Sequence, residues 1–222
     1  MKLIAHRVFR DGETFDSLDA GRLEGYHGVE LDIRDDGQGG VCINHAPLFR
    51  RRRGGHDLSG RSLCDAVAVF GESMPSLEFL FLDVKTHAAA VILSEKVKRG
   101  EVPFDVIFNC WHIDEVRSIR ERLPRATVFF CVAPIFSKRL ARRRFNDLYL
   151  TNSFPFFWRG GSFQPDDEKA NRHNINVKLI SPETLKATLP DAIDGVCVHR
   201  IFHSAPLLDF VARRGLLSAV YG

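Results

Sequence analysis

The stretch Gly28-Val29-Glu30-Leu31-Asp32-Ile33-Arg34 has the aliphatic content of a buried β-strand, yet it carries two carboxylates. Side chains alternate between the two faces of a strand, so Glu30 and Asp32 share one face and Val29, Leu31 and Ile33 share the other. Removing an unpaired charge from water costs several kcal/mol. The stretch therefore predicts a strand with one face packed against apolar partners and the other turned toward a polar site.

Three other short runs in the first 85 residues also end in polar residues that can ionise: Leu3 to Arg7, Val41 to His45 and Phe81 to Lys85. The same alternation places Asp83 and Lys85 on one face of their strand. Carboxylates from two neighbouring strands can surround a hard divalent cation with oxygen ligands. We therefore expect Glu30, Asp32 and Asp83 to hold one Mg²⁺ or Ca²⁺ ion. A purely structural set of ion pairs with Arg7 and Lys85 is the alternative.

Strand and helix signals alternate along the chain, which argues for a parallel α/β fold. Polar residues near the carboxyl ends of several strands favour a TIM (β/α)8-type barrel over an open sheet. The strands are expected at Leu3–Arg7, Gly28–Arg34, Val41–His45, Phe79–Lys85, Val106–Cys110, Thr127–Val132, Gly195–Arg200 and Leu216–Tyr221. The helices are expected at Thr14–Leu23, 62–71, His87–Lys98, Ile113–Arg122 and Ala205–Arg214. Residues 134–189 are left without assignment, apart from an aromatic cluster, Phe154 to Trp158.

The composition fits a single domain spanning 1–222, because 45% hydrophobic residues can form one sizeable core and nothing marks a linker. A net charge of +3 suits a small anionic substrate but is too weak to indicate nucleic acid. Five scattered cysteines without paired spacing indicate neither a structural zinc nor a disulfide framework. No apolar run approaches membrane length and the N-terminus lacks a signal peptide pattern, so we expect a cytoplasmic protein without stable membrane insertion.

His6 and His45 are the candidate proton carriers, because histidine titrates closest to neutral pH. Each ends an apolar strand near the expected carboxylate cluster. Arg7 offers a planar fork that suits phosphate oxygens, and Lys85 offers a point charge.

Together these motifs resemble the glycerophosphodiester phosphodiesterase family: His6-Arg7, Glu30-x-Asp32 preceded by Gly28, His45 after a hairpin, and Asp83-x-Lys85. The resemblance covers residues 3–132 and, more weakly, 195–222. It implies a TIM barrel that hydrolyses a small glycerol-linked phosphodiester to glycerol 3-phosphate and an alcohol. It also implies that Glu30, Asp32 and Asp83 bind the metal, that His6 and His45 are general acid and base, and that Arg7 and Lys85 bind the phosphate.

The sequence departs from the family pattern at several positions. Val8 stands where the family has glycine, Ala46 where it has aspartate, and Asp83 where it has glutamate. Glu13 is an uncertain extra ligand. The family's last strand has no counterpart, so the barrel is expected to be irregular or incomplete at its C-terminal end, or to close with a strand from Asn176 to Ser181.

These departures leave two alternatives open. One is a catalytically degraded barrel that binds a phosphorylated ligand without turnover. The other is a phospholipase D-like lyase that forms a cyclic phosphate. The oligomeric state is not indicated by the sequence.

Overall fold

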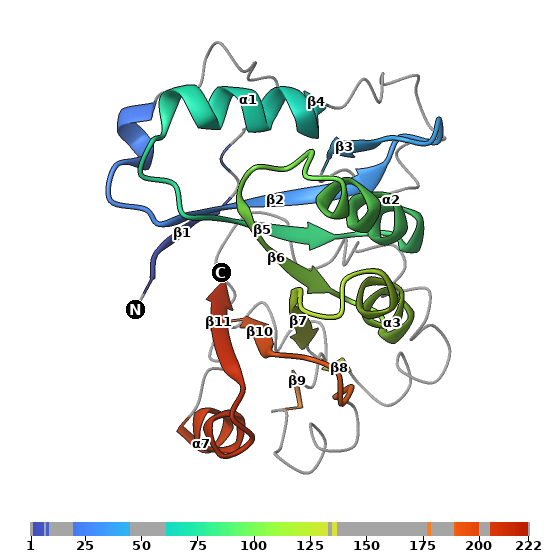
Figure 1. Cartoon of the computed structure of the whole chain (residues 1–222). Helices are drawn as coiled ribbons and strands as arrows, with labels where there is room; N and C mark the ends of the chain where they lie inside the picture. Colours follow the sequence, from blue (N-terminus) through green and yellow to red (C-terminus); the bar gives the residue numbers. More distant parts are fainter. Residues whose placement is uncertain are drawn as a thin grey trace. The chain divides into compact units, whose positions relative to one another are not determined.

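The computed structural model describes residues 2–6, 8, 20–44, 61–132, 135–136, 177–178, 189–199 and 205–221 (Figure 1). The chain divides into two compact units, Met1–Val128 and Phe129–Gly222. Whether they act as one domain, as expected for 1–222, stays a prediction.

The first unit is built on a sheet with strand order β4-β3-β2-β5-β6. The central strand β2 (Gly28–Asp35) runs parallel to β5 (Phe79–Val84), which runs parallel to β6 (Asp105–Cys110). The other edge of β2 pairs with β1 (Ile4–Ala5) in parallel and, further along, with β3 (Val41–Ile43) in antiparallel. Strand β4 (Arg61–Ser62), which is not expected from the sequence, pairs antiparallel with β3.

The helices of this unit are α1 (Leu63–Ser73), α2 (His87–Lys98) and α3 (Ile113–Arg122). Polar side chains begin two of them: Ser62 Oγ accepts from the backbone N–H of Cys64, and Thr86 Oγ1 accepts from that of Ala89. Such caps satisfy backbone donors that the first helical turn leaves without partners. The predicted ranges of α2 and α3 are confirmed. Of the expected helix Thr14–Leu23, only a short 3-10 helix, Ala20–Leu23, lies within the described residues.

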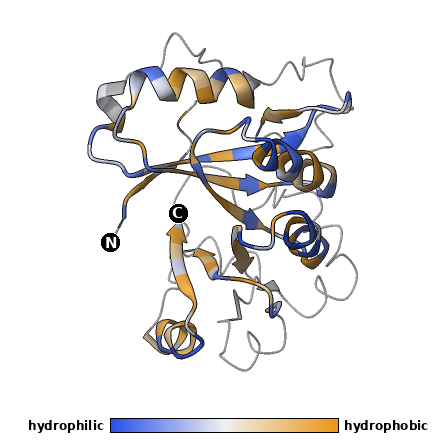
Figure 2. Cartoon of the chain, in the orientation of Figure 1, coloured by the Kyte–Doolittle hydropathy of each residue, from blue (hydrophilic) through white to orange (hydrophobic). Residues whose placement is uncertain are grey.

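Both faces of β2 and β5 are buried, as expected of a parallel sheet that is covered on both faces. Figure 2 shows hydrophilic residues interrupting the otherwise hydrophobic strands β2, β5 and β6. The fully buried aliphatic side chains include Val29, Ile33, Leu80, Leu82 and Leu93. The apolar face predicted from Val29, Leu31 and Ile33 is thus confirmed.

The second unit holds parallel strands in the order β7-β10-β11, where β7 (Thr127–Val132) begins just before the unit boundary. Strand β10 (Gly195–His199) pairs in parallel with β7 and with β11 (Leu217–Tyr221), and α7 (Ala205–Arg213) connects β10 to β11. These elements were expected within one or two residues.

The expectation that a strand from Asn176 to Ser181 closes the barrel is wrong for its described part. Val177–Lys178 forms β9, which pairs antiparallel with β8 (Ile135–Phe136) in a separate two-stranded sheet. A two-residue antiparallel ladder cannot take the place of a parallel barrel strand, because its backbone direction is reversed. The aromatic cluster Phe154 to Trp158 lies outside the described residues.

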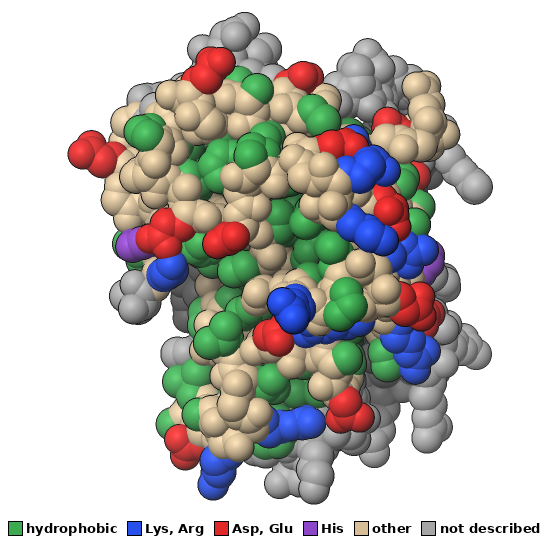
Figure 3. Space-filling model, in the orientation of Figure 1, with side chains coloured by type: hydrophobic (Ala, Val, Ile, Leu, Met, Phe, Trp, Pro, Cys, Tyr) green, Lys and Arg blue, Asp and Glu red, His purple; other side chains and the backbone are tan. Residues whose placement is uncertain are grey.

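All five cysteines are free thiols, and Cys42, Cys110, Cys131 and Cys197 are buried. Over the face drawn in Figure 3, the described Lys and Arg side chains are interspersed with Asp and Glu. Among the described residues, the helices are all too short or too polar to cross a bilayer.

Candidate metal and phosphate site

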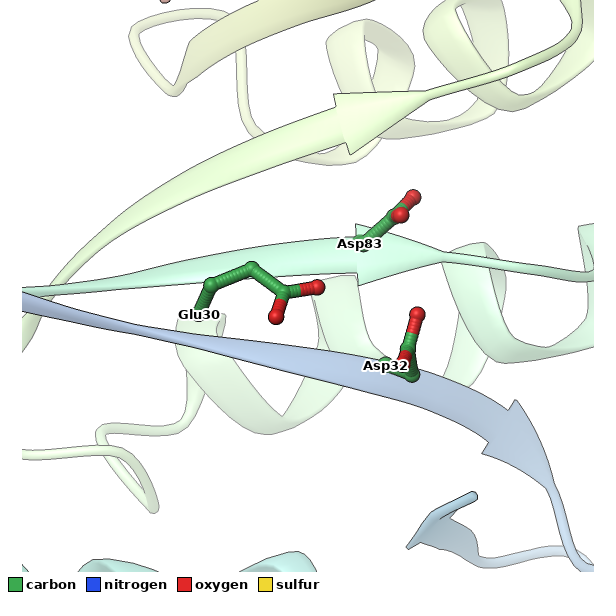
Figure 4. Close-up of side chains that lie close together, drawn as sticks. All are labelled: Glu30, Asp32 and Asp83. Atoms are coloured by element: carbon green, nitrogen blue, oxygen red, sulfur yellow. The ribbon is translucent and has the colours of Figure 1, made fainter. Parts of the chain in front are cut away.

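Three carboxylates meet on one face of the first unit's sheet. One oxygen from each of Glu30, Asp32 and Asp83 lies within 4.8 Å of the others, and all three residues are buried. Figure 4 shows Glu30 and Asp32 side by side along β2, with Asp83 on the neighbouring strand β5. The predicted convergence of these acids is therefore present in the structure.

Strand register explains why they meet. Glu30 lies opposite Phe81 and Asp32 lies opposite Asp83 across β2 and β5, while Asp83 lies opposite Asn109 across β5 and β6. In parallel strands such residues project from the same face. A one-residue slip of either strand would turn the acids toward the helices.

Lys85 lies against two of these carboxylates. Its Nζ is 2.8 Å from Asp32 Oδ1 and also forms an ion pair with Asp83 Oδ2. Burial opposes the charge, but the two carboxylates outweigh it and raise the pKa of Lys85 above its usual value. The ammonium also lies 5.0 Å from the ring centroid of Trp111, within cation–π range. Lys85 is thus a fixed positive charge inside the cluster.

Asp83 has a partner for each of its oxygens. Besides the bond from Lys85 to Oδ2, the indole Nε1–H of Trp111 donates to Oδ1. Burial raises the pKa of Asp83, as does the neighbouring Asp32, while the charge and hydrogen bonds of Lys85 act in the other direction. A cation near these oxygens would favour the charged carboxylate.

The first turn of α3 adds a further buried acid, Glu115. Its Oε2 accepts from the backbone N–H groups of Trp111, at 2.8 Å, and of His112, at 3.0 Å. Burial raises the pKa of Glu115 to about 7 against the lowering effect of those two hydrogen bonds. Glu115 therefore fixes the backbone of the residue whose indole holds Asp83.

His6 directly follows β1, and its Nε2 lies 3.7 Å from Glu30 Oε2. Its side chain is 43% exposed, so it borders the buried carboxylates and still reaches solvent. That position suits a proton carrier. The predicted partners Arg7 and His45 lie outside the described residues, as do Glu13 and Ala46. Their predicted roles stay predictions.

The residues present fit a divalent cation. Three carboxylates against Lys85 leave two excess negative charges in the cluster itself, and oxygen donors from acids are what Mg²⁺ and Ca²⁺ prefer. The oxygens that bond Lys85 and Trp111 each retain a further lone pair for coordination. The chemistry of the donor set thus supports the predicted class of ion without selecting between the two.

Sequence reasoning missed Arg34, Asn109, Trp111 and Glu115. Strand alternation could have found Arg34 and Asn109, because they share a face with Asp32 and Asp83. Asn109 is buried, and its Oδ1 has no hydrogen-bond partner among the described residues. Trp111 directly follows β6, at the strand end where barrel sites are found. Glu115 carries only the signal of an acid in the first turn of a helix.

Comparison with known proteins gives matches to solved structures alone. No protein-family model matches the chain, and no curated protein matches it in sequence. A phosphodiesterase from Oleispira antarctica, solved in complex with the product sn-glycerol-3-phosphate, is 16% identical with a TM-score of 0.60, over 100% of this chain and 84% of that one.

Two further structures are similar to a comparable degree. A glycerophosphodiester phosphodiesterase from Parabacteroides distasonis is 16% identical with a TM-score of 0.56, over 99% of this chain and 83% of that one. A glycerophosphodiester phosphodiesterase from Agrobacterium tumefaciens is 15% identical with a TM-score of 0.55, over 100% of this chain and 86% of that one. At such identities the likeness concerns the fold.

The expected C-terminal irregularity is also met. The described parallel strands are β1, β2, β5 and β6 in the first unit and β7, β10 and β11 in the second, fewer than the eight of a complete barrel. The chain has the fold of the glycerophosphodiester phosphodiesterases, a TIM (β/α)8-type barrel that is incomplete in its described part.

Proposed function

We propose that the protein is a metal-dependent phosphodiesterase that hydrolyses a small glycerol-linked phosphodiester to glycerol 3-phosphate and an alcohol. The observation that carries the proposal is the buried cluster of Glu30, Asp32 and Asp83, within 4.8 Å of one another. It occupies strands of a fold that the compared glycerophosphodiester phosphodiesterases share. The complex of the Oleispira protein with sn-glycerol-3-phosphate supports the class of product.

One Mg²⁺ or Ca²⁺ ion is the proposed cofactor, held by Glu30, Asp32 and Asp83. When bound, such an ion stabilises negative charge that develops on a phosphoryl oxygen. Lys85 fixes the positions of Asp32 and Asp83, and Trp111 fixes the remaining oxygen of Asp83. The predicted contact of Lys85 with the phosphate itself is retained as part of the proposal.

The protein's own chemistry is proton transfer by His6 and His45. In the proposed hydrolysis, the oxygen of a water or substrate hydroxyl forms a bond to phosphorus, and the bond from phosphorus to the alcohol oxygen breaks. Where the substrate hydroxyl attacks, a cyclic phosphate forms, and water then adds to phosphorus and opens the ring to give glycerol 3-phosphate. One histidine takes the proton of the attacking oxygen, and the other gives a proton to the departing alkoxide.

The test is hydrolysis of glycerophosphocholine, followed by phosphorus NMR, with Mg²⁺ or Ca²⁺ and after metal removal by EDTA. The proposal expects glycerol 3-phosphate only when metal is present. It expects at least about a hundredfold loss in His6→Ala and in Asp32→Asn, the scale of a lost proton carrier. Asp114→Asn is the matched control, because Asp114 is an exposed aspartate on α3.

The same experiment decides between the alternatives. Accumulation of a cyclic phosphate would favour the phospholipase D-like lyase. Calorimetric binding of a phosphate ester without turnover would favour the degraded barrel. Full activity of His6→Ala would contradict the histidine assignment.

A further inference from the structure

A buried arginine beside the carboxylate cluster has most of its hydrogen-bonding capacity unused. Arg34 is only 4% exposed. Its Nε donates to the backbone oxygen of Asn44 at 3.2 Å. Its two terminal nitrogens, Nη1 and Nη2, have no hydrogen-bond partner within the part of the chain that the structure describes. Leaving buried donors without acceptors costs free energy, more so for a charged group.

Arg34 belongs to the same face as the acids. It follows Asp32 by two positions on β2, so its side chain projects from the face that carries Glu30 and Asp32. The register of β2 against β5 also relates Arg34 to Lys85. Ile33 lies opposite Val84, and the backbone N–H of Lys85 donates to the backbone oxygen of Ile33. Arg34 and Lys85 therefore occupy the next position on two adjacent strands.

Electrostatics agree with this placement. Burial lowers the pKa of Arg34, and the charges of Asp32 and Asp83 are the strongest influences in the other direction. The guanidinium stays charged despite this, as arginine does in proteins. Its positive charge is thus balanced through space by the cluster, while no described residue accepts a hydrogen bond from its terminal N–H groups.

The two cations of this face differ in what they can offer a ligand. The ammonium of Lys85 is already paired with Asp32 and Asp83. Arg34 presents a planar fork whose Nη1 and Nη2 have no hydrogen-bond partner among the described residues, the geometry that binds two oxygens of one phosphate. With Arg34 counted, three carboxylates face two cations, so a divalent ion would leave one excess positive charge. A singly charged phosphodiester would neutralise it.

We propose that Arg34 binds a non-bridging oxygen pair of the substrate's phosphate through Nη1 and Nη2. The inference rests on the proposed function for the identity of the ligand, but the site it describes is an anion site that can be tested without turnover. Its bond to Asn44 holds the guanidinium in place, so little order is lost when the anion binds.

The test uses the full chain with Mg²⁺ and measures binding of inorganic phosphate and of sn-glycerol 3-phosphate by calorimetry, with glycerol as the uncharged control. Arg34→Gln is expected to weaken phosphate binding about 10- to 100-fold, which corresponds to loss of one or two charge-assisted hydrogen bonds. Arg34→Lys keeps the charge but not the fork, so an intermediate loss is expected. Arg117→Gln is the control, because Arg117 is an exposed arginine of α3.

Kinetics separate substrate binding from a purely structural role. If Arg34 only supported the chain around Asn44, its variants would lower kcat and stability with unchanged phosphate affinity, and that result overturns the inference. Arg34→Lys provides the test if Arg34→Gln does not fold, and wild-type affinity in it is equally contradictory. If the wild type hydrolyses no phosphodiester but the Arg34 variants lose phosphate binding, the proposed function is contradicted and the inference about Arg34 stands. If the wild type hydrolyses the diester and the Arg34 variants keep its KM and phosphate affinity, the inference about Arg34 is contradicted and the proposed function stands.

Discussion

The ammonium of Lys85 lies 2.8 Å from Asp32 Oδ1 and pairs at the same time with Asp83, so one cation joins carboxylates from two adjacent strands. The side chain of Lys85 is only 4% exposed. The pair is thus well removed from solvent, where breaking an ion pair leaves an uncompensated charge. Lys85 thereby holds carboxylates of two strands together, and a cation bound by Glu30, Asp32 and Asp83 would compete with its ammonium for them.

Replacing Lys85 tests this competition. Lys85→Met is expected to lower the free energy of unfolding of the metal-free protein by about 3–5 kcal/mol, the scale of a broken buried pair. Saturating Ca²⁺ or Mg²⁺ is expected to stabilise the variant more than the wild type, since the carboxylates have lost their cation. Urea unfolding with and without metal measures both effects. The control is Lys96→Met, which removes a more exposed ion pair with Glu101, and equal effects in the two variants would contradict the account.

Trp111 offers a spectroscopic test of the site. Its indole donates to Asp83, so a Tb³⁺ ion bound by the three carboxylates would lie close to it and accept its excitation energy. Trp111→Phe is expected to lose most of the sensitised terbium emission while still binding the ion, as measured by competition with Ca²⁺. Trp158, the other tryptophan, is present in both proteins and so serves as an internal reference. Unchanged emission in Trp111→Phe would contradict the location of the site.

Glu115 predicts a pH dependence of stability. Its pKa is raised from 4.5 to about 7 in the folded protein, so between these values the folded state keeps a proton that the unfolded state has lost. Its contribution to stability is therefore fully present below pH 4.5 and is lost as the pH rises through 7. The loss amounts to about 3 kcal/mol.

Glu115→Gln removes this titration and keeps an oxygen that can accept from Trp111 and His112. The free energy of unfolding of the variant, relative to the wild type, is expected to rise by about 3 kcal/mol from pH 4.5 to 7 in denaturant titrations. Glu121→Gln, an exposed glutamate of the same helix, is the matched control and is expected to show little change. A pH-independent difference for Glu115→Gln would rule the prediction out.

Gly28 is required by a close approach of an aromatic ring. A Cβ at this position would lie 2.3 Å from the ring of Phe79, its partner across β2 and β5. Gly195 and Phe129 repeat the arrangement in the second unit, at 2.5 Å. Gly28→Ala is expected to cost about 1–3 kcal/mol of stability, measured by urea unfolding, because the ring must shift.

A double variant shows whether the ring is the cause. Gly28→Ala combined with Phe79→Leu is expected to cost less than the sum of the two single changes, since the leucine leaves room for the new methyl group. Additive costs would assign the effect to the backbone instead.

The sequence was sufficient for those features that depend on local pattern. The alternation in β2 predicts that Glu30 and Asp32 share one face, and the ranges expected for α2 and α3 match those observed. The meeting of Asp83 with that pair follows from parallel register, which the shared strand ends suggested. These predictions are confirmed because each depends on periods of two or 3.6 residues.

Other features depend on contacts that no local pattern encodes. The ion pairs of Lys85 with Asp32 and Asp83 depend on the register of β2 against β5. The hydrogen bond from Trp111 to Asp83 depends on the conformation of the loop after β6. The alternative that a strand from Asn176 to Ser181 closes the barrel is wrong for Val177–Lys178, which pairs with β8, because a short apolar run does not specify its partner. Residues such as Glu115 are likewise indistinguishable from a surface acid until the helix is packed.

The central claim is that Glu30, Asp32 and Asp83 together bind a divalent cation, and calorimetric titration of the EDTA-treated protein with Mg²⁺ and Ca²⁺ tests it most directly. The account predicts one ion per chain in the wild type and in Asp114→Asn. It predicts at least a tenfold loss of affinity in Asp32→Asn and in Asp83→Asn, where a charged ligand becomes neutral. Wild-type affinity in both of these variants, or no binding by the wild type, would contradict it.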